Sequence, residues 1–490
     1  MISDLFLDKM STFPGRIPEL PGIMIDKLEA DASLNAFFIS HDHADHKRGI
    51  TDPNFQEFMK CKTSQRKIYV SPITAQMLLN REELTFLHEF IIALELDTPH
   101  EIRIRTSCSA VLSQSDSPLV GRNFSINESE TIEYTLTVTL TSAEHIMGSV
   151  MFLFEKTIEP KVANPLFRCL YTGDFRLTID EIRSKRCLQD RSRSGVPCAK
   201  VFDAVYFDST WCTPRNLWSI PRREDVLEEL GPIVKRHLAA KAENIVCLYT
   251  NYNIGYENLL RWLANFSESK IHVNESRLML YRGFPGIQDI FTTNTDCRVH
   301  FCQEGPPQTY RSCERVRHGF KTTVLRLKAS YMWFIKACYI NAETSTCMRN
   351  PRFPNEYNVC WSTHSSLEEI MDLLDYLNPS RACPNVVDKR TNETEILDLL
   401  RRRATTPKAW HPNHPLDSFE PPQLRIQAIF PKKLSPKKFM LDSSVRRDMS
   451  SSSDEDSPEE TLEERLRKKG RLAVTPKPRK TITLDHLRPS

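Results

Sequence analysis

The segment His41-Asp42-His43-Ala44-Asp45-His46 concentrates imidazoles and carboxylates in one short stretch. His41 and His43 are two residues apart, so that in an extended turn both rings can face one metal ion. Asp45 and His46 follow one turn later and can face a second ion about 3.5–4 Å from the first. Mixed His and Asp ligands favour zinc, manganese or magnesium. A polar surface loop is the alternative, but the register of the side chains favours a two-metal site.

A second group of metal-ligand types lies in the middle of the chain. His300 and Cys302 form an HxC pair, Cys313 follows, and His272 precedes them. Two thiols and two imidazoles complete a tetrahedral set and leave no open position, which is typical of structural rather than catalytic zinc. The alternative is that these are ordinary buried thiols. We expect a structural zinc ion.

The elements that must position these residues are predicted by hydrophobic periodicity. Residues 36–39 form an apolar run directly before the first histidine, as a buried strand does. Residues 135–140 alternate Thr with Leu and Val, as expected of a strand with one buried face. Further strands are expected at 67–70, 149–154, 169–172, 245–248 and 324–327, and helices at 224–240 and 366–377. The body of the chain is therefore predicted to be α/β.

Composition excludes several classes of protein. Hydrophobic residues make up 40% and charged residues 26%, which is enough apolar material for a core. There is no apolar run of about eighteen residues that would predict a transmembrane helix. Asp4, Asp8 and Lys9 make the N-terminal segment a poor secretory signal, so the 14 cysteines are expected to be reduced thiols or metal ligands. Neither GxGxxG nor GxxxxGK[ST] occurs, which argues against a glycine-rich phosphate cradle.

The C-terminal part of the chain has a different composition. From residue 401 onward there are 20 Lys+Arg against 12 Asp+Glu, whereas residues 1–400 hold 46 against 51. We expect residues 405–490 to form a disordered basic Ser/Pro-rich tail. Its basic clusters suggest nuclear import or added affinity for phosphate. Ser450–Ser453, followed by acidic residues, form an expected phosphorylation site.

The motifs and their order resemble a known family. HxHxDH after a strand is similar to the signature of the metallo-β-lactamase fold. The wider set resembles the β-CASP DNA-repair nucleases over about residues 20–400. The segments that carry the resemblance are AFFISHDHADH (36–46), YVSPIT (69–74), HIMGSVMFLF (145–154), YTGDFR (171–176), YFDSTWC (206–212) and HSS (364–366).

The resemblance implies an αββα metallo-β-lactamase sandwich with an inserted β-CASP domain. The first part of the sandwich would cover residues 1–205 and the β-CASP domain residues 206–360. Residues 361–404 would return to the sandwich and bring His364 to the metal site, ahead of the tail at 405–490. The cleft between the two domains would bind DNA.

The resemblance also assigns ligands. His41, His43, His145 and Asp174 would hold the first metal. Asp45 and His46 would hold the second, with Asp174 as a bridge. The carboxylates of Asp45, Asp174 and Asp208 and the imidazole of His364 would be catalytic, with His364 reaching the second metal or the scissile phosphate.

Several further residues are expected to support this site. The Ser365 and Ser366 hydroxyls would donate to phosphate, and Lys328 would touch phosphate. Asp26 is a candidate partner for a metal-bound histidine. In two places the chain departs from the family pattern: it has HIMGS where the family reads HCPGS, and Asn251 where a phosphate-contacting Lys is usual.

The expected function is a metal-dependent DNA endonuclease or 5'-exonuclease that processes hairpins, overhangs and damaged ends in double-strand break repair by non-homologous end joining. Zn²⁺, Mg²⁺ or Mn²⁺ would serve the active site, and one branch of the family has a zinc-finger-like site with the ligand order seen here. DNA ends, DNA-dependent protein kinase and end-joining factors are the expected partners, and a monomer in the nucleus, away from membranes, is expected. The alternatives are an RNA-processing β-CASP nuclease, another cross-link repair 5'-exonuclease, and an inactive DNA-binding scaffold.

Overall fold

The computed structural model describes residues 11–61, 65–107, 131–158, 165–191, 195–212, 220–250, 252–303, 311–319, 323–337, 345–387 and 392–404. All of them belong to one compact unit. The basic tail expected at 405–490, with Ser450–Ser453, and Asn251 lie outside the described residues.

A four-stranded parallel sheet carries the first motif. Its strands, in spatial order, are β1 (Ile23–Ile25), β2 (Ala36–Phe38), β3 (Lys67–Val70) and β4 (Ile91–Ala93). All three residues of β2 are buried, as expected of a parallel strand covered on both faces. The chain leaves β2 at its carboxyl end, where loops of parallel sheets commonly carry functional residues.

A six-stranded mixed sheet packs against the first. Its order is β19 (Arg381–Pro384), β11 (Ala204–Phe207), β8 (Phe167–Tyr171), β7 (Val150–Thr157), β6 (Thr131–Ser142) and β5 (Pro99–Ser107). Phe38 of the first sheet meets Phe152 and Phe154 of the second at ring-centroid distances of 5.5 and 5.1 Å. Such aromatic contacts across the two inner faces form the core of a sandwich.

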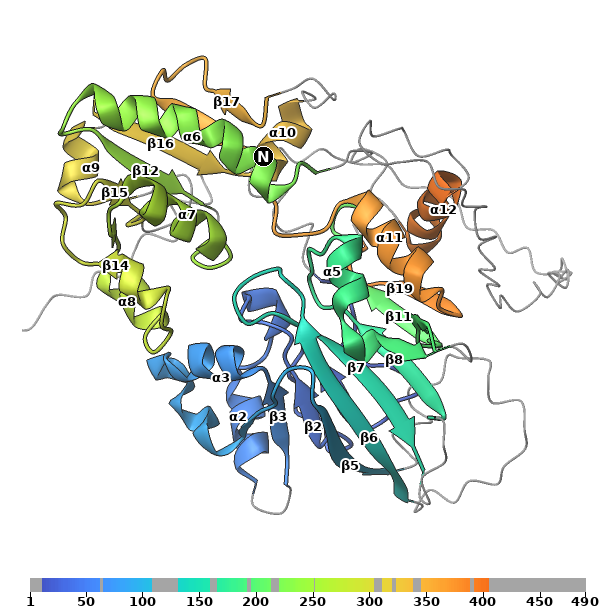
Figure 1. Cartoon of the computed structure of the whole chain (residues 1–490). Helices are drawn as coiled ribbons and strands as arrows, with labels where there is room; N and C mark the ends of the chain where they lie inside the picture. Colours follow the sequence, from blue (N-terminus) through green and yellow to red (C-terminus); the bar gives the residue numbers. More distant parts are fainter. Residues whose placement is uncertain are drawn as a thin grey trace, which may run out of the picture. The chain divides into compact units, whose positions relative to one another are not determined.

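Helices cover both outer faces of this sandwich (Figure 1). On the four-stranded sheet these are α2 (Pro53–Lys60), α3 (Pro72–Leu79) and the 3₁₀ segment η2 (Glu82–Glu89). On the six-stranded sheet they are α5 (Ile179–Ser184), α11 (Leu367–Leu377) and α12 (Glu393–Ala404). The layers are therefore αββα, and the predicted fold class is confirmed.

A third sheet of seven strands forms a separate core. Its order is β14 (Phe291–Thr292), β13 (Ile271–His272), β15 (Val299–His300), β12 (Ile245–Tyr249), β16 (Val324–Ala329), β18 (Glu356–Val359) and β17 (Cys347–Arg349). All neighbours are parallel except β17 and β18. The helices of this region are α6 (Arg223–Ala240), α7 (Glu257–Ser267), α8 (Glu275–Leu280), α9 (Glu314–Gly319) and α10 (Tyr331–Ala337).

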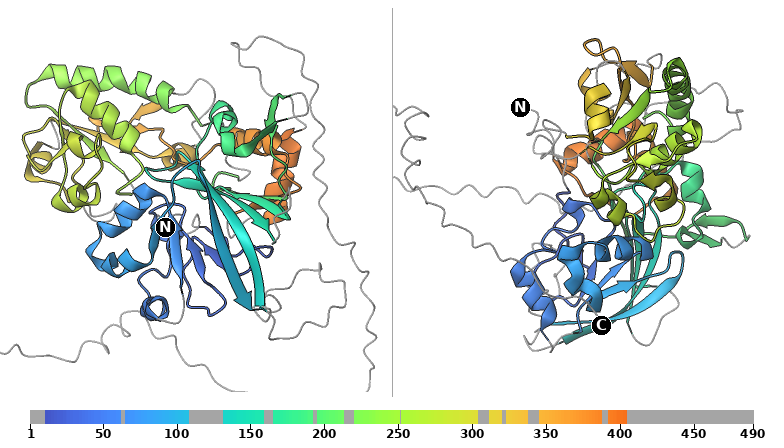
Figure 2. Two further views of the ribbon diagram at one scale, coloured as in Figure 1. Left: turned by 60° about the horizontal axis from the view of Figure 1, so that its bottom comes forward. Right: turned by 90° about the vertical axis from the view of Figure 1, so that its left-hand side faces the viewer.

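The chain enters and leaves the third sheet between two neighbouring strands of the second. β11 pairs in parallel with both β8 and β19, although β19 comes more than 150 residues later. Figure 2 (left) shows the orange α11–α12 segment next to the green strands of the six-stranded sheet. The boundary expected at residue 206 falls inside β11, so the first part of the sandwich extends at least to Phe207.

Short elements fill the connections. They are the 3₁₀ segments η1 (Ala44–His46), η3 (Arg186–Leu188) and η4 (Gln288–Ile290) and the antiparallel pair β9 (Gln189–Arg191) and β10 (Pro197–Ala199). Within the ranges that the structure describes, no helix has the length and apolar character needed to cross a membrane.

Candidate metal centres

The first histidine cluster forms at the carboxyl end of β2. His41 is fully buried, and its Nε2 lies 3.0 Å from His43 Nδ1. His145, from the loop between β6 and β7, places its Nε2 at 3.1 Å from the same His43 nitrogen. Three ring nitrogens therefore converge from two segments about a hundred residues apart.

Asp174, in the loop after β8, adds a carboxylate to this cluster. Its Oδ2 lies 3.7 Å from His41 Nε2 and 3.5 Å from His145 Nε2. Ligands bound to zinc at about 2.0–2.2 Å in a tetrahedron stand roughly 3.3 Å apart. The observed spacings of 3.0 to 3.7 Å fit that requirement, so these four side chains have the composition and geometry of a metal site.

The second part of the centre is built around the same carboxylate. His46 Nε2 lies 3.2 Å from Asp174 Oδ2 and 3.6 Å from Asp45 Oδ2. This nitrogen is buried and has no hydrogen-bond partner among the described residues. Burial alone would lower the pKa of His46, but Asp174, Asp26 and Asp45 outweigh it and raise the pKa well above its usual value. A cation at this position would satisfy both the orphaned nitrogen and the carboxylates.

Asp208 joins the centre from the position directly after β11, and His364 joins it from the segment after β18. His364 Nδ1 donates to Asp208 Oδ2 at 2.8 Å and lies 3.8 Å from Asp174 Oδ2. Asp208 is held in turn by the backbone N–H and hydroxyl of Thr210. Asp174, Asp208 and His364 form a second group with metal-ligand spacing, so Asp174 is shared by both groups. In the neutral ring, the donor bond to Asp208 leaves His364 Nε2 as the acceptor nitrogen.

Asp26 orients the histidines from behind. Its Oδ2 accepts from His46 Nδ1 at 2.7 Å, from Ser40 Oγ at 2.6 Å and from Tyr171 Oη at 2.9 Å. The backbone of Asp26 has a φ of 54°, in the left-handed region that Asp tolerates better than most residues. His145 is fixed in the same manner, because its Nδ1 donates to Thr363 O at 2.8 Å. Bonds of this kind select the ring nitrogen that faces the metal.

We expect Asp26→Asn to weaken metal binding about 10- to 100-fold while the fold is retained. An amide can replace only part of the three-donor network on Oδ2, and it lacks the negative charge that supports His46. Competition against a chelator of known affinity measures the effect. Asp97→Asn is the matched control, since Asp97 has the same φ of 54° but is exposed and is not among the metal-site groups. Equal metal affinity in the two variants would contradict the assignment.

The HIMGS loop keeps the geometry that His145 needs. Ser149 Oγ accepts from the backbone N–H groups of His145 and Ile146 at 3.1 and 3.2 Å and donates to Ile146 O at 2.8 Å. Gly148 has a φ of 85°, and a Cβ there would meet Ile73 at 2.6 Å. The Gly-Ser turn therefore closes the loop, although Ile146 and Met147 replace the residues that the family usually has.

The residues expected to bind phosphate have other partners. Ser365 Oγ donates to Phe175 O at 2.9 Å, and Ser366 Oγ accepts from Glu369 N as the N-cap of α11. Both serines are almost fully buried. Lys328 Nζ pairs with the buried Glu356 at 2.7 Å in the third sheet. Ser365 is thus engaged in packing, Ser366 in helix capping and Lys328 in an ion pair, and phosphate binding by the three residues stays a prediction.

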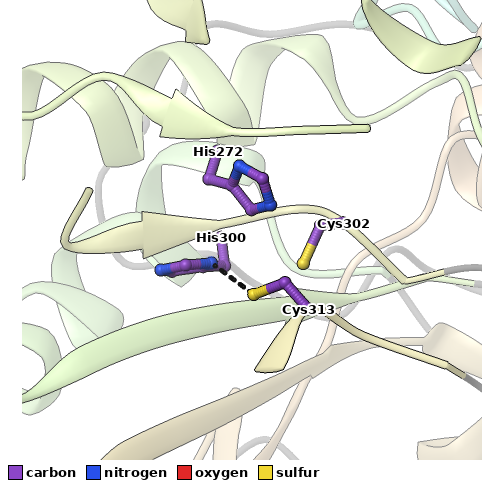
Figure 3. A group of neighbouring side chains, drawn as sticks. All are labelled: His272, His300, Cys302 and Cys313. Atoms are coloured by element: carbon purple, nitrogen blue, oxygen red, sulfur yellow. Dashed lines mark hydrogen bonds between the residues drawn. The ribbon is translucent and has the colours of Figure 1, made fainter. Parts of the chain in front are cut away.

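The second predicted metal set also comes together, and Figure 3 shows its four side chains converging. His272 and His300 lie opposite each other on the parallel strands β13 and β15, with ring centroids 5.0 Å apart. Cys302 follows β15, and Cys313 Sγ lies 3.4 Å from His300 Nδ1. The four ligand atoms all lie within 4.8 Å of one another.

The donor set of this cluster fits a tetrahedral ion. His300 Nε2 donates to Cys297 O at 2.9 Å, which leaves Nδ1 as the ligand nitrogen. The hydrogen bond between the two thiols lowers the pKa of Cys313 and raises the pKa of Cys302. The two sulfur atoms lie close enough together for one cation to be bound by both. His272 Nδ1 is buried with no partner among the described residues.

One neighbour of the first centre was not anticipated from the sequence. The ring of Tyr252 lies 5.3 Å from the ring of His43, although it belongs to the loop between β12 and α7. No local pattern marks this residue, because the contact exists only once the third sheet and the sandwich are in place.

The αββα layers and a histidine–aspartate cluster at the strand ends define a protein with the metallo-β-lactamase fold, and a family model supports this. Residues 285–390 match the model described as DNA repair metallo-beta-lactamase.

Individual proteins extend the similarity over most of the chain. Protein artemis of Homo sapiens is 28% identical over 412 residues, which cover 83% of this chain and 53% of that protein. Protein artemis of Gallus gallus is 31% identical over 412 residues, covering 81% and 52%. The 5' exonuclease Apollo of Danio rerio is 26% identical over 373 residues, covering 76% and 52%.

The chain spans about half the length of these curated relatives. The resemblance drawn from the HDHADH, YTGDFR and HSS motifs is confirmed: the chain has the metallo-β-lactamase fold and is similar to Artemis over most of its length.

Proposed function

We propose that this protein is a metal-dependent phosphodiesterase that cleaves DNA. The observation that carries the proposal is the position of Asp174, which faces the three-histidine group on one side and the Asp208–His364 pair on the other. A shared carboxylate between two ligand groups is the arrangement that a two-ion phosphodiesterase needs. Divalent ions held there would supply Lewis-acid stabilisation of phosphoryl oxygens and a water of lowered pKa.

The protein's own side chains would do the rest. Asp26 and Thr363 O fix the ring orientation of His46 and His145, so that little reorganisation is needed when substrate binds. Asp208 holds the His364 ring through Nδ1, so the other ring nitrogen, Nε2, is not used in this bond. His364 is 21% exposed in its side chain, whereas Asp208 is 1% exposed. His364 is therefore the member of this pair that can contact a phosphodiester oxygen or exchange a proton with it.

DNA is preferred over other esters on the basis of similarity. The matched family model is described as a DNA repair metallo-beta-lactamase, and the similar proteins are named Artemis and 5' exonuclease Apollo. The proposed substrates are hairpins, overhangs and damaged DNA ends, and the proposed process is double-strand break repair by non-homologous end joining.

The identity of the metal ions, the partners and the location in the cell are part of the same proposal. Zn²⁺ or Mg²⁺, with Mn²⁺ as a substitute, would occupy the active site, and Zn²⁺ would occupy the Cys₂His₂ cluster because soft thiolates favour it. DNA-dependent protein kinase and end-joining factors are proposed partners. A nuclear location is proposed from the Lys and Arg clusters after residue 400.

A substrate panel tests the proposal. The full chain is incubated with DNA hairpins, DNA overhangs, blunt duplex, single strands and RNA of the same sequences, first with chelator and then with each metal added back. We expect metal-dependent cleavage of DNA hairpins and overhangs at rates about ten-fold or more above those for RNA, since the two differ in helix geometry and the 2'-hydroxyl.

Two results would contradict it. Preferential cleavage of RNA would favour an RNA-processing β-CASP nuclease. Stoichiometric metal binding without cleavage of any nucleic acid would favour a DNA-binding scaffold that has lost activity.

A further inference from the structure

Tyr252 presents an open aromatic surface next to the metal centre. Its ring is tilted by 36° over the ring of the ligand His43, at a centroid distance of 5.3 Å. At the same time 53% of the residue is exposed. The residue therefore contacts a metal ligand while about half of its surface remains open to solvent. Among the described residues Tyr252 is not a member of any buried apolar cluster, so core packing does not account for an aromatic ring here.

Hydrogen bonds join Tyr252 and the described residues on either side of it to the third sheet. Thr250 Oγ1 donates to Tyr252 O at 2.7 Å, and Gln303 Nε2 donates to Thr250 O at 2.8 Å. On the other side, Arg277 donates to Asn253 Oδ1 at 2.7 Å. Backbone atoms held in this way lose little conformational freedom when a ligand packs against the neighbouring ring.

The two side chains that make these hydrogen bonds, Gln303 and Arg277, lie next to the Cys₂His₂ cluster. Gln303 follows Cys302 directly, and Arg277 donates to the carbonyl of Phe301, which lies between the ligands His300 and Cys302. The guanidinium of Arg277 also lies over the Phe301 ring, 3.8 Å from its centroid. The strand end that carries two ligands of the cluster thus also positions the Tyr252 loop.

We propose that Tyr252 is a stacking site for an unpaired nucleobase whose phosphodiester lies at the metal centre. The inference rests on the proposed nuclease function and deepens it by assigning a binding position for the base. A base inside a duplex is covered on both faces by its neighbours, so only a base at an end, in a hairpin loop or in an overhang can offer a face to this ring. Every base has a π-face, so the site selects unpaired character rather than sequence.

The test uses the full chain and DNA overhangs that carry the fluorescent base 2-aminopurine at successive positions across the junction. Stacking of that base on an aromatic ring quenches its fluorescence. We expect the full-length protein to quench one or two adjacent positions. Tyr252→Leu should abolish this quenching and raise KM for overhang cleavage about ten-fold with a smaller change in kcat, since base stacking contributes mainly to binding. Tyr252→Phe should retain both properties because it keeps the ring.

Phe353→Leu is the matched control, because Phe353 is also an exposed aromatic residue, 47% exposed, in the turn between β17 and β18. Unchanged quenching and KM in Tyr252→Leu would overturn the stacking site while the nuclease function stood. Conversely, quenching that depends on Tyr252 in a protein that cleaves no nucleic acid would support the stacking site and reject the proposed function. The experiment therefore distinguishes failure of the stacking site from failure of the nuclease function.

Discussion

Asp174→Asn is expected to reduce metal-dependent cleavage by on the order of 10³ or more, the largest effect of any single substitution in the centre. Asp174 Oδ2 lies within 3.8 Å of His41, His46, His145 and His364 ring nitrogens. The substitution keeps the size of the side chain and removes the negative charge that balances the ions. Bound metal per chain should fall along with the cleavage rate, while the melting temperature changes little.

The matched control is Asp180→Asn, which removes a carboxylate from the exposed first turn of α5, shortly after Asp174 in the chain. This control should bind metal and cleave DNA like the unmodified protein. Full metal occupancy together with unimpaired cleavage in Asp174→Asn would show that the two ligand groups do not share this carboxylate.

Cys302→Ser is expected to lower the stability of the fold more than the cleavage rate. We expect a zinc ion to be bound by His272, His300, Cys302 and Cys313. Loss of this ion should lower the free energy of unfolding by more than about 4 kcal/mol. For a domain of this size that corresponds to a fall in melting temperature of roughly 10 °C. Bound zinc should fall by about one ion per chain, and the metal content of the histidine–aspartate centre should be unchanged.

Cys297→Ser is a close control for this experiment. Cys297 lies next to the cluster and contributes its carbonyl oxygen to His300, but its thiol is not among the ligand groups. A serine keeps that carbonyl, so zinc content and melting temperature should stay as they are. If Cys302→Ser left both quantities unchanged as well, the four side chains would be a hydrogen-bonded cluster and not a metal site.

The sequence allowed the ligands of the first centre to be predicted because much of the information is local. His41, His43 and His46 lie on one turn after a strand of three buried residues, and their spacing alone brings them together. His145, Asp174 and His364 required the family resemblance, since nothing in their own segments indicates that they meet. The Cys₂His₂ set was predictable from residue type, although its register on β13 and β15 was not.

Other contacts could not have been predicted, for physical reasons. A serine next to a ligand histidine is equally able to donate to a phosphate or to cap a helix, and Ser366 caps α11 because Glu369 completes a capping box with it. Lys328 was expected near phosphate, and its Nζ pairs with Glu356 on the neighbouring strand β18, a buried carboxylate that needs a cation. The ring of Tyr252 reaches His43 only through tertiary packing.

The edge of the six-stranded sheet has a consequence for how the protein is made. β11 is complete only when β19 pairs with it, and the backbone N–H groups of Thr12 and Phe13 donate to Asn385 O. At about 5–20 residues per second, translation separates these strands by roughly 9–35 s. All strands of the third sheet lie between residues 245 and 359. This sheet can therefore form before β19 is made and the six-stranded sheet is complete. The metal centre, which needs His364, is therefore among the last parts of the molecule to assemble on the ribosome.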